Sequence, residues 1–196
     1  MPITTRVSLL RETPGAFETA TVELDDPRQG ELTVKLAATG LCHSDDHILK
    51  GDMSLVGPRP NVKRETDLYT PAEKKLLSVK PGVTDFASIV FADEGDILKD
   101  QADPDLAYNQ LIRPYKSRLG LLYVENASLV LDIKLVILTA VAIIDRESAL
   151  DALQNILREL KADPDLIRVA ARKDPLQPAP PPGADAIVTT RDAKAA

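Results

Sequence analysis

The hydrophobic pattern of this chain changes near residue 50, and that change limits the fold more than any other feature of the sequence. Before it, apolar and polar residues alternate over 19–24 and again over 32–37, a period typical of half-buried strands, with a turn-forming stretch at 25–30. After residue 70 the chain carries helix start signals instead. The sequence therefore predicts an α+β chain, in which a small β-rich N-terminal segment, residues 1–48, precedes a mainly helical domain, residues 49–173.

Helix starts can be located from their capping residues. Thr70-Pro71-Ala72-Glu73 has the form of a capping box with proline in the first turn. Asp103-Pro104 and Asp163-Pro164 repeat the arrangement of a capping side chain followed by proline. Over residues 149–160 the apolar side chains fall on one stripe at helical spacing, which predicts an amphipathic helix packed on a core.

Residues 129–144 are the most apolar stretch, although Asp132 and Lys134 interrupt it. The stretch is shorter than the roughly 20 residues that a membrane-spanning helix needs. It predicts either a buried core helix or a helix that lies in a membrane interface, and the sequence leaves both open.

The C-terminal part, residues 174–196, is predicted to be an extended, disordered tail. From 174 to 182 five of nine residues are proline, which favours extended backbone and removes amide donors. Residues 184–196 show no pattern that builds a core.

Composition and charge exclude several classes of protein. The net charge of the 196 residues is -6, so sequence-independent binding of nucleic acid is not expected. A single cysteine excludes a disulfide framework and a four-cysteine zinc site within the chain. The N-terminus lacks the apolar core of a signal peptide. We expect a cytoplasmic chain, either free or peripheral on the inner face of the cell membrane.

The first segment resembles the start of zinc-dependent medium-chain alcohol dehydrogenases. The resemblance runs over about residues 6–48 and ends in Cys42-His43-Ser44-Asp45, where the cysteine of that family is a catalytic zinc ligand. The Gly-His-Glu motif of the next ligand and a Gly-x-Gly-x-x-Gly dinucleotide loop are both absent, so zinc and NAD are not expected. A buried structural thiol at Cys42 is the simpler interpretation, with a Cys42/His43/His47 metal cluster as the alternative.

A second set of motifs begins at residue 49. They are Leu49-Lys50-Gly51-Asp52-Met53-Ser54-Leu55-Val56-Gly57-Pro58-Arg59-Pro60, Leu68-Tyr69-Thr70, Val79-Lys80-Pro81-Gly82-Val83-Thr84, Tyr108…Ile112…Pro114…Lys116, Tyr123-Val124 and Ser128…Asp132-Ile133-Lys134. With these motifs the chain, to about residue 182, resembles bacterial sugar transferases, the monotopic phosphoglycosyl transferases that begin exopolysaccharide and O-antigen synthesis.

The resemblance implies transfer of a sugar-1-phosphate from a nucleotide diphosphate sugar to polyprenyl phosphate, with Mg²⁺ as the expected ion. Positive side chains must stabilise the phosphate oxygens in such a transfer. Arg59, between two prolines on stiff backbone, suits bidentate phosphate contact. Further candidates that line the diphosphate are Lys80, Arg113, Lys116 and Arg118. For each cation the alternative is an ordinary solvated surface charge.

The Asp-Glu pair that the resemblance implies as nucleophile and metal-holding neighbour is missing. Counting back from Leu49, its two positions hold Gly40 and Leu41, neither of which can act. Asp93-Glu94 lies too far along the chain to replace it, and Asp45-Asp46 lacks the following Glu and Leu-Pro. Asp45 and Asp46, with Cys42, are weak candidates for metal contact.

Three interpretations follow from the sequence. In the first, the chain descends from sugar transferases, and its catalysis is impaired because the dyad is absent. In the second, it is a non-catalytic chimeric or truncated product, whose junction lies near residues 49–53. In the third, it is a fragment of a zinc-dependent alcohol dehydrogenase.

Overall fold

The computed structural model describes residues 3–9, 11–12, 16, 18–25, 52–61 and 63–190. The chain divides into two compact units, Met1–Met53 and Ser54–Ala196, close to the boundary predicted at residue 48. The two units are described separately below. Strands in the first unit and mostly helices in the second confirm the predicted α+β class.

The described part of the first unit is a β-hairpin. Strands β1 (Ile3–Leu9) and β2 (Glu18–Leu24) pair antiparallel, with Val7 opposite Ala20 and Thr5 opposite Val22. Along β2 the half-buried residues Ala20 and Val22 alternate with exposed neighbours, as the period of the sequence predicts. The predicted strand over 32–37 lies outside the described residues.

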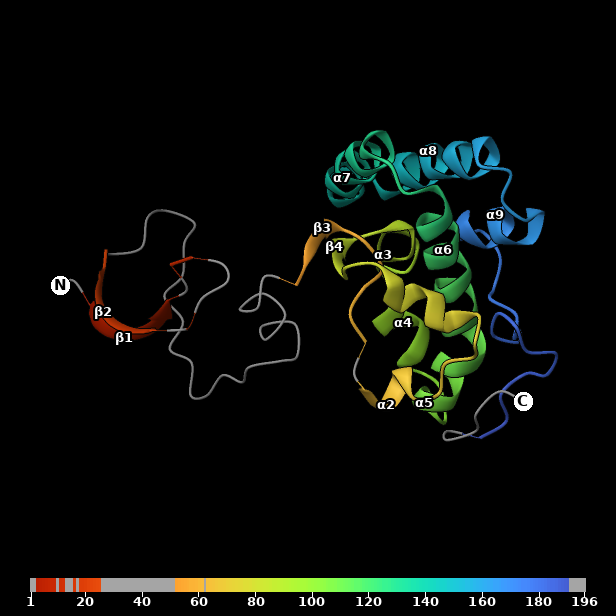
Figure 1. Cartoon of the computed structure of the whole chain (residues 1–196), viewed down its shortest axis with the longest axis horizontal. Helices are drawn as coiled ribbons and strands as arrows, with labels where there is room; N and C mark the ends of the chain where they lie inside the picture. The colour runs from red at the N-terminus through yellow and green to blue at the C-terminus, as the bar shows by residue number, and fades with distance from the viewer. Residues whose placement is uncertain are drawn as a thin grey trace. The chain divides into compact units, whose positions relative to one another are not determined.

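The second unit is mostly helical, and a pair of very short strands lies at its edge (Figure 1). Strands β3 (Ser54–Val56) and β4 (Gly82–Thr84) pair in parallel. The helices, in chain order, are α2 (Lys63–Thr66), the 3₁₀-helix η1 (Glu73–Ser78), α3 (Phe86–Val90), α4 (Glu94–Leu98), α5 (Pro104–Ala107), the π-helix η2 (Tyr108–Ile112), α6 (Arg113–Asn126), α7 (Leu129–Ile144), α8 (Arg146–Glu159) and α9 (Pro164–Ala170).

The predicted helix caps are confirmed. The Thr70 amide donates to Glu73 Oε2 at 2.9 Å and the Glu73 amide donates to Thr70 Oγ1 at 3.0 Å, the reciprocal pair of a capping box. Asp103 caps α5 and Asp163 caps α9, each through a side-chain oxygen. The one difference is that Thr70 and Glu73 open a 3₁₀-helix rather than an α-helix.

The core of this unit forms where α6 packs on α3 and where α7 and α8 pack on each other. Phe86, Ile112, Tyr115 and Leu119 are among its fully buried members on the α6 side. On α8 the predicted stripe is buried, and its apolar members are Ala149, Leu150, Leu153, Ile156 and Leu157. The stripe therefore fixes how α8 faces the core.

Residues 174–190 do not form the disordered tail that the sequence predicts. They are extended, and they run beside α6, as the blue end of the ribbon in Figure 1 shows. Tyr115 Oη donates to the Gln177 carbonyl at 2.9 Å, and the Ala179 amide donates to the Gln110 carbonyl at 3.0 Å. Pro114 stands four residues after Gln110 and has no N–H to donate to it. The tail therefore satisfies a carbonyl that the helix leaves without its usual donor.

No helix among the described residues is long and apolar enough to cross a membrane. Helix α7 buries Leu131, Leu135 and Leu138 and leaves most of its other apolar side chains exposed. The sequence left open whether 129–144 forms a core helix or an interfacial helix. Helix α7 has features of both, because one face is buried in the core and another apolar face is exposed.

Candidate phosphate-binding site

Two loops that contain glycine and proline lie against each other beside the small parallel sheet. The Ser54 amide donates to the Pro81 carbonyl at 2.8 Å, and the Gly82 amide donates to the Pro58 carbonyl at 3.0 Å. A Cβ atom at Gly57 would lie 2.5 Å from the Lys80 carbonyl oxygen, so the loops can approach this closely only with glycine at that position. The loops bring Arg59 and Lys80 to the same region, and both side chains are exposed.

A buried carboxyl group lies behind these loops. Asp85 caps α3, and its Oδ1 accepts hydrogen bonds from the Ser88 amide at 2.7 Å and the Ser88 hydroxyl at 2.6 Å. Burial raises the pKa of Asp85, although the Ser88 hydrogen bonds and the nearby charges of Lys116 and Arg59 act in the opposite direction. Arg59 and Lys116 are therefore both charged neighbours of Asp85.

Lys116, on α6, completes the positive part of the site. Its ammonium forms an ion pair with Glu94 and lies 5.5 Å from the centre of the Tyr108 ring. Tyr108 begins the π-helix η2, and such π-helical turns frequently occur at functional sites. Glu94, Tyr108 and Lys116 therefore form a polar cluster beside the loop cations.

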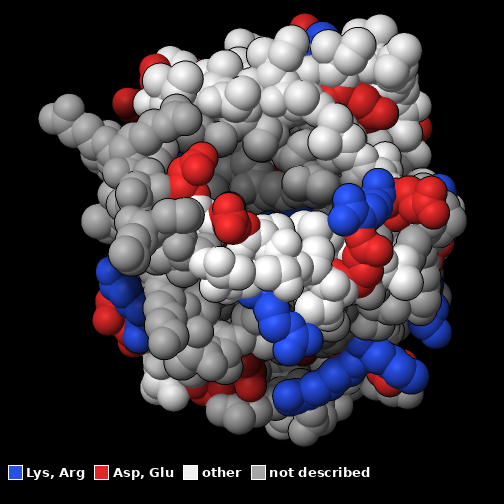
Figure 2. All heavy atoms as spheres, turned by 90° about the vertical axis from the view of Figure 1, so that its left-hand side faces the viewer, with Lys and Arg blue, Asp and Glu red and all other residues white. Residues whose placement is uncertain are grey.

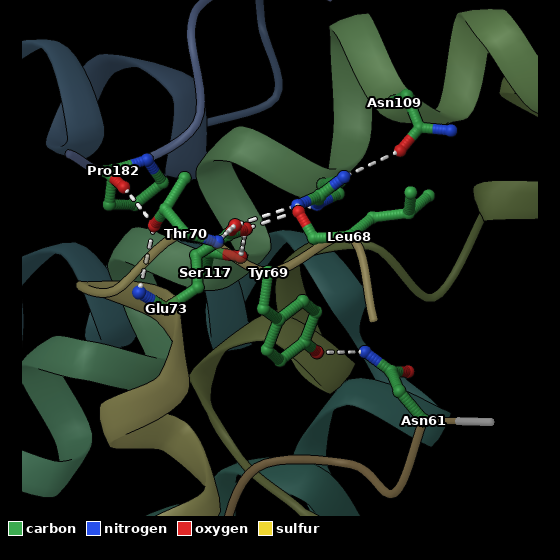
Figure 3. Close-up of polar contacts among 9 residues, drawn as sticks. Asn61, Leu68, Tyr69, Thr70, Glu73, Asn109, Ser117 and Pro182 are labelled. Carbon is green, nitrogen blue, oxygen red and sulfur yellow. Dashed lines mark hydrogen bonds and ion pairs between the residues drawn. The ribbon is translucent and has the colours of Figure 1, made fainter. Parts of the chain in front are cut away.

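Arg113 lies in a different environment, a buried polar network around Glu73. Figure 3 labels the other members of this network that are described next, Leu68, Glu73, Asn109 and Ser117. Its Nη2 donates to Glu73 Oε2 at 2.7 Å and to the Leu68 carbonyl at 2.7 Å, and its Nη1 donates to Asn109 Oδ1 at 3.1 Å. Ser117 Oγ donates to Glu73 Oε1 at 2.7 Å from the adjoining turn of α6. The guanidinium is thus engaged inside the protein, where it ties α6 to η1 and to the loop that carries Tyr69.

Arg118 points away from the other candidates. It contacts Asp165 of α9 at 4.0 Å and donates to the Pro180 carbonyl of the tail at 3.3 Å. Residues two apart on an α-helix lie about 200° apart around its axis, so Lys116 and Arg118 face opposite sides of α6. The structure therefore brings the loops of Arg59 and Lys80 together and puts Lys116 near Asp85, whereas Arg113 and Arg118 lie elsewhere.

Asp93, which belongs to the Asp-Glu pair set aside above, is held by two arginines. Arg146 Nη2 donates to its Oδ1 at 2.7 Å and Arg172 Nη2 donates to its Oδ2 at 3.1 Å. Burial acts to raise the pKa of Asp93, but the hydrogen bonds and charges of the two arginines outweigh it and hold that pKa below the usual range. Asp93 therefore links α8 to the turn after α9. A carboxylate that is held by two arginines is not available to attack phosphorus.

The predicted metal and dyad positions lie outside the described residues. These positions are Gly40, Leu41, Cys42, Asp45 and Asp46, together with His43 and His47. Within the described part of the chain, no group of three or more His, Cys, Asp or Glu residues is arranged to hold a metal ion.

Asp85, Glu94 and Tyr108 were not predicted as site residues. A signal for Asp85 was present, because Asp85-Phe86-Ala87-Ser88 has the spacing of a helix N-cap. Tyr108 belongs to the sugar transferase motif Tyr108…Ile112…Pro114…Lys116, and Glu94 belongs to the Asp93-Glu94 pair, but only packing brings both side chains to Lys116.

Comparison with known proteins agrees with the two resemblances. The model of the bacterial sugar transferase family matches residues 46–146, just over half of the chain. The uncharacterized sugar transferase EpsL of Bacillus subtilis is 36% identical over 93 residues, which cover 47% of this chain and 38% of EpsL. The galactosyl transferase CpsE of Streptococcus agalactiae is 40% identical over 62 residues, 31% of this chain and 14% of CpsE.

A second group of relatives consists of alcohol dehydrogenases. The NDMA-dependent alcohol dehydrogenase of Amycolatopsis methanolica is 43% identical over 78 residues, which cover 40% of this chain and 21% of the enzyme. The chain thus spans about a fifth of that relative and well under half of EpsL. No solved structure matches the chain. The family match over residues 46–146, which contains Arg59, Lys80 and Lys116, shows that this chain belongs to the bacterial sugar transferase family.

Proposed function

We propose that the domain from residue 49 onward binds a nucleotide diphosphate sugar, for transfer of its sugar-1-phosphate to polyprenyl phosphate, and that catalysis in this chain is impaired. The observation that carries the proposal is the close approach of the two loops that carry Arg59 and Lys80, with Lys116 as a further charged neighbour of Asp85. Family membership supports a sugar transferase role. The identity of the sugar donor, the identity of the lipid acceptor and the impaired catalysis are parts of the proposal.

In this proposal Arg59, Lys80 and Lys116 bind the diphosphate. Arg59 offers a fork of donors on backbone stiffened by Pro58 and Pro60, which suits two phosphate oxygens at once. Lys116 offers a single charge whose direction Glu94 and Tyr108 limit. Arg113 acts as a positioning residue, because its buried contacts hold α6, and with it Lys116, against η1.

Impaired catalysis follows from the residues at the dyad positions. Gly40 and Leu41 have no group that could attack phosphorus. Within the described residues, Asp85 is held by Ser88, Asp93 by two arginines, and Glu94 by Lys116. None of these carboxylates is both accessible and free of a partner, so none is assigned as a substitute.

Mg²⁺ is part of the proposal through the family resemblance alone. The described carboxylates near Arg59 are engaged by protein donors and do not fit a magnesium cage. We therefore assign no residue to the metal and derive no step through it.

The acceptor is a lipid, so we also propose that α7 rests on the membrane surface. Its exposed apolar side chains include Val130, Ile133, Ile137 and Ile144, spaced at three, four and seven residues along one face. The upper part of Figure 2, at the height of α7 and α8, carries few charged side chains. Such a face suits shallow insertion at the interface rather than crossing.

The proposal is tested by release of nucleoside monophosphate from a panel of nucleotide sugars, with polyprenyl phosphate and Mg²⁺ in detergent. The chain as it stands is compared with the double variant Gly40→Asp/Leu41→Glu. We expect turnover only in the double variant. Turnover in the chain as it stands would contradict impaired catalysis, and failure of both to bind any donor would contradict the proposed donor site.

Arg59 is tested in the same assay, in the background of the double variant. Loss of a charge-assisted contact worth about 1.5–3 kcal/mol should make Arg59→Gln roughly 10- to 100-fold less active. Lys63→Gln is the matched control, because Lys63 is exposed and its ion pair is with Asp67, in its own helical turn. Equal activity of the two variants would exclude Arg59 from the donor site.

A further inference from the structure

A cavity lies between α8 and the turn after α9. Its volume is about 230 Å³. Arg146, Glu147, Leu150 and Asp151 line it from α8, and Arg172 and Lys173 line it from the turn. Because drug-sized ligands usually occupy about 300 Å³ or more, this cavity suits a smaller molecule.

The two arginines of this cavity have unused hydrogen-bond donors. Each donates through Nη2 to Asp93, and Arg146 Nη2 also donates to the Val90 carbonyl at 3.1 Å. The Nε atoms of both are buried and have no acceptor among the described residues. A buried donor without an acceptor costs about 1–3 kcal/mol, so each of these Nε groups would gain from an acceptor that a ligand supplies.

The position of Arg172 is held by the fold. Its backbone has φ of 54°, a left-handed conformation that is costly for a residue with a side chain. Its guanidinium lies 5.7 Å from the centre of the Phe91 ring, and only 12% of its side chain is exposed. These contacts keep the guanidinium at the cavity instead of extending into solvent.

We propose that this cavity is a binding site for a small oxyanion, a phosphate or carboxylate group, held by Arg146, Arg172 and Lys173. One carboxylate, Asp93, is shared by two guanidiniums, which leaves one positive charge before Lys173 is counted. Glu147 and Asp151, both exposed on the α8 wall, oppose a highly charged ligand. They favour a ligand with a single anionic group and hydroxyl donors, such as a phosphorylated polyol.

The whole chain is titrated with inorganic phosphate and, separately, with glycerol 2-phosphate at constant ionic strength. Binding is monitored through the NMR shifts of the backbone amides. We expect saturable shifts around residues 146–151 and 171–173, and potassium chloride should not reproduce them. Arg172→Gln should weaken phosphate binding about tenfold or more, as expected for loss of a charge-assisted fork. Lys173→Gln, an exposed change that leaves the fold intact, should weaken it by a smaller factor.

The controls separate this site from the donor site. Arg168→Gln changes an exposed arginine of α9 that pairs with Asp165 and Asp174, and it should leave phosphate affinity unchanged. Arg59→Gln should remove any phosphate-dependent shifts near Arg59 and keep those at the cavity. The inference is overturned by phosphate shifts confined to the Arg59 region, by an equal effect of chloride, or by unchanged affinity in both Arg172→Gln and Lys173→Gln.

Discussion

At the scale of single residues, Glu73 and Arg113 form a buried ion pair that should be costly to break. Both side chains are almost fully buried, at 0% and 3% exposed, and they form an ion pair of 2.7 Å. Glu73→Ala would leave the guanidinium charge buried without its partner. We expect it to lower the free energy of unfolding by about 3–5 kcal/mol, measured by urea denaturation.

The matched control for Glu73 is an ion pair at the surface. Lys63 and Asp67 also approach to 2.8 Å, but both side chains are more than half exposed. Asp67→Ala should change the same free energy by less than about 1 kcal/mol. Similar losses in both variants would contradict a special role for the buried pair.

Asp85 gives a prediction of pH dependence. Burial raises its pKa in the folded protein above the value near 3.8 of an unperturbed carboxyl group. Its protonated form therefore stabilises the fold at low pH, and this contribution is lost as pH rises through the folded pKa. Asp85→Asn keeps the oxygen that accepts from Ser88 and never ionises. The free energy of unfolding of Asp85→Asn, minus that of the unmodified chain, should therefore increase between about pH 4 and pH 7 when both are measured by urea denaturation.

The control for Asp85 separates the cap from the charge. Asp85→Ala removes the acceptor of the Ser88 amide and hydroxyl, so it should cost about 1 kcal/mol as a lost N-cap. If Asp85→Asn shows the same stability difference at both pH values, the pKa of Asp85 is not raised.

At the scale of elements, the C-terminal segment should behave as part of the folded domain. Val188 is 4% exposed and its neighbour Ile187 is 40% exposed, and the Val188 carbonyl accepts from Gln110 Nε2 at 2.7 Å. Val188→Ala should lower the free energy of unfolding by about 1.5 kcal/mol through the two methyl groups lost from burial. Ile187→Ala, measured alongside it by thermal denaturation, should cost less. Equal costs would indicate that the segment is not packed as described.

At the scale of the whole molecule, the second unit should fold without the first. The described core runs from Val56 to Ala179 and takes no residue from Met1–Met53. A chain of residues 54–196 should therefore unfold at the same temperature as the second unit of the intact chain, measured by calorimetry. A drop of more than about 2–4 °C, equivalent to about 1 kcal/mol for a domain of about 150 residues, would mean that the first unit stabilises the second.

Local chemistry explains what could be predicted from the sequence. The caps at Thr70, Asp103 and Asp163 and the buried stripe of α8 were predictable, because they depend on side chains within about four residues along the chain. The close loops at Gly57 and Gly82 carried family motifs in the sequence, although the contact between them required β3 and β4 to pair.

Long-range contacts decided the rest. Arg59 and Arg113 are the same residue type and were predicted for the same role, yet Glu73, 40 residues from Arg113, buries one of them in an ion pair. The proline-rich segment was predicted to be disordered, because nothing within it shows that the Gln110 carbonyl lacks a helical donor and accepts from Ala179. The sequence by itself determined where helices begin, which face of α8 is apolar, and the family. Tertiary structure alone decided which cations are exposed and where the tail binds, because burial and charge pairing depend on residues far apart in the chain.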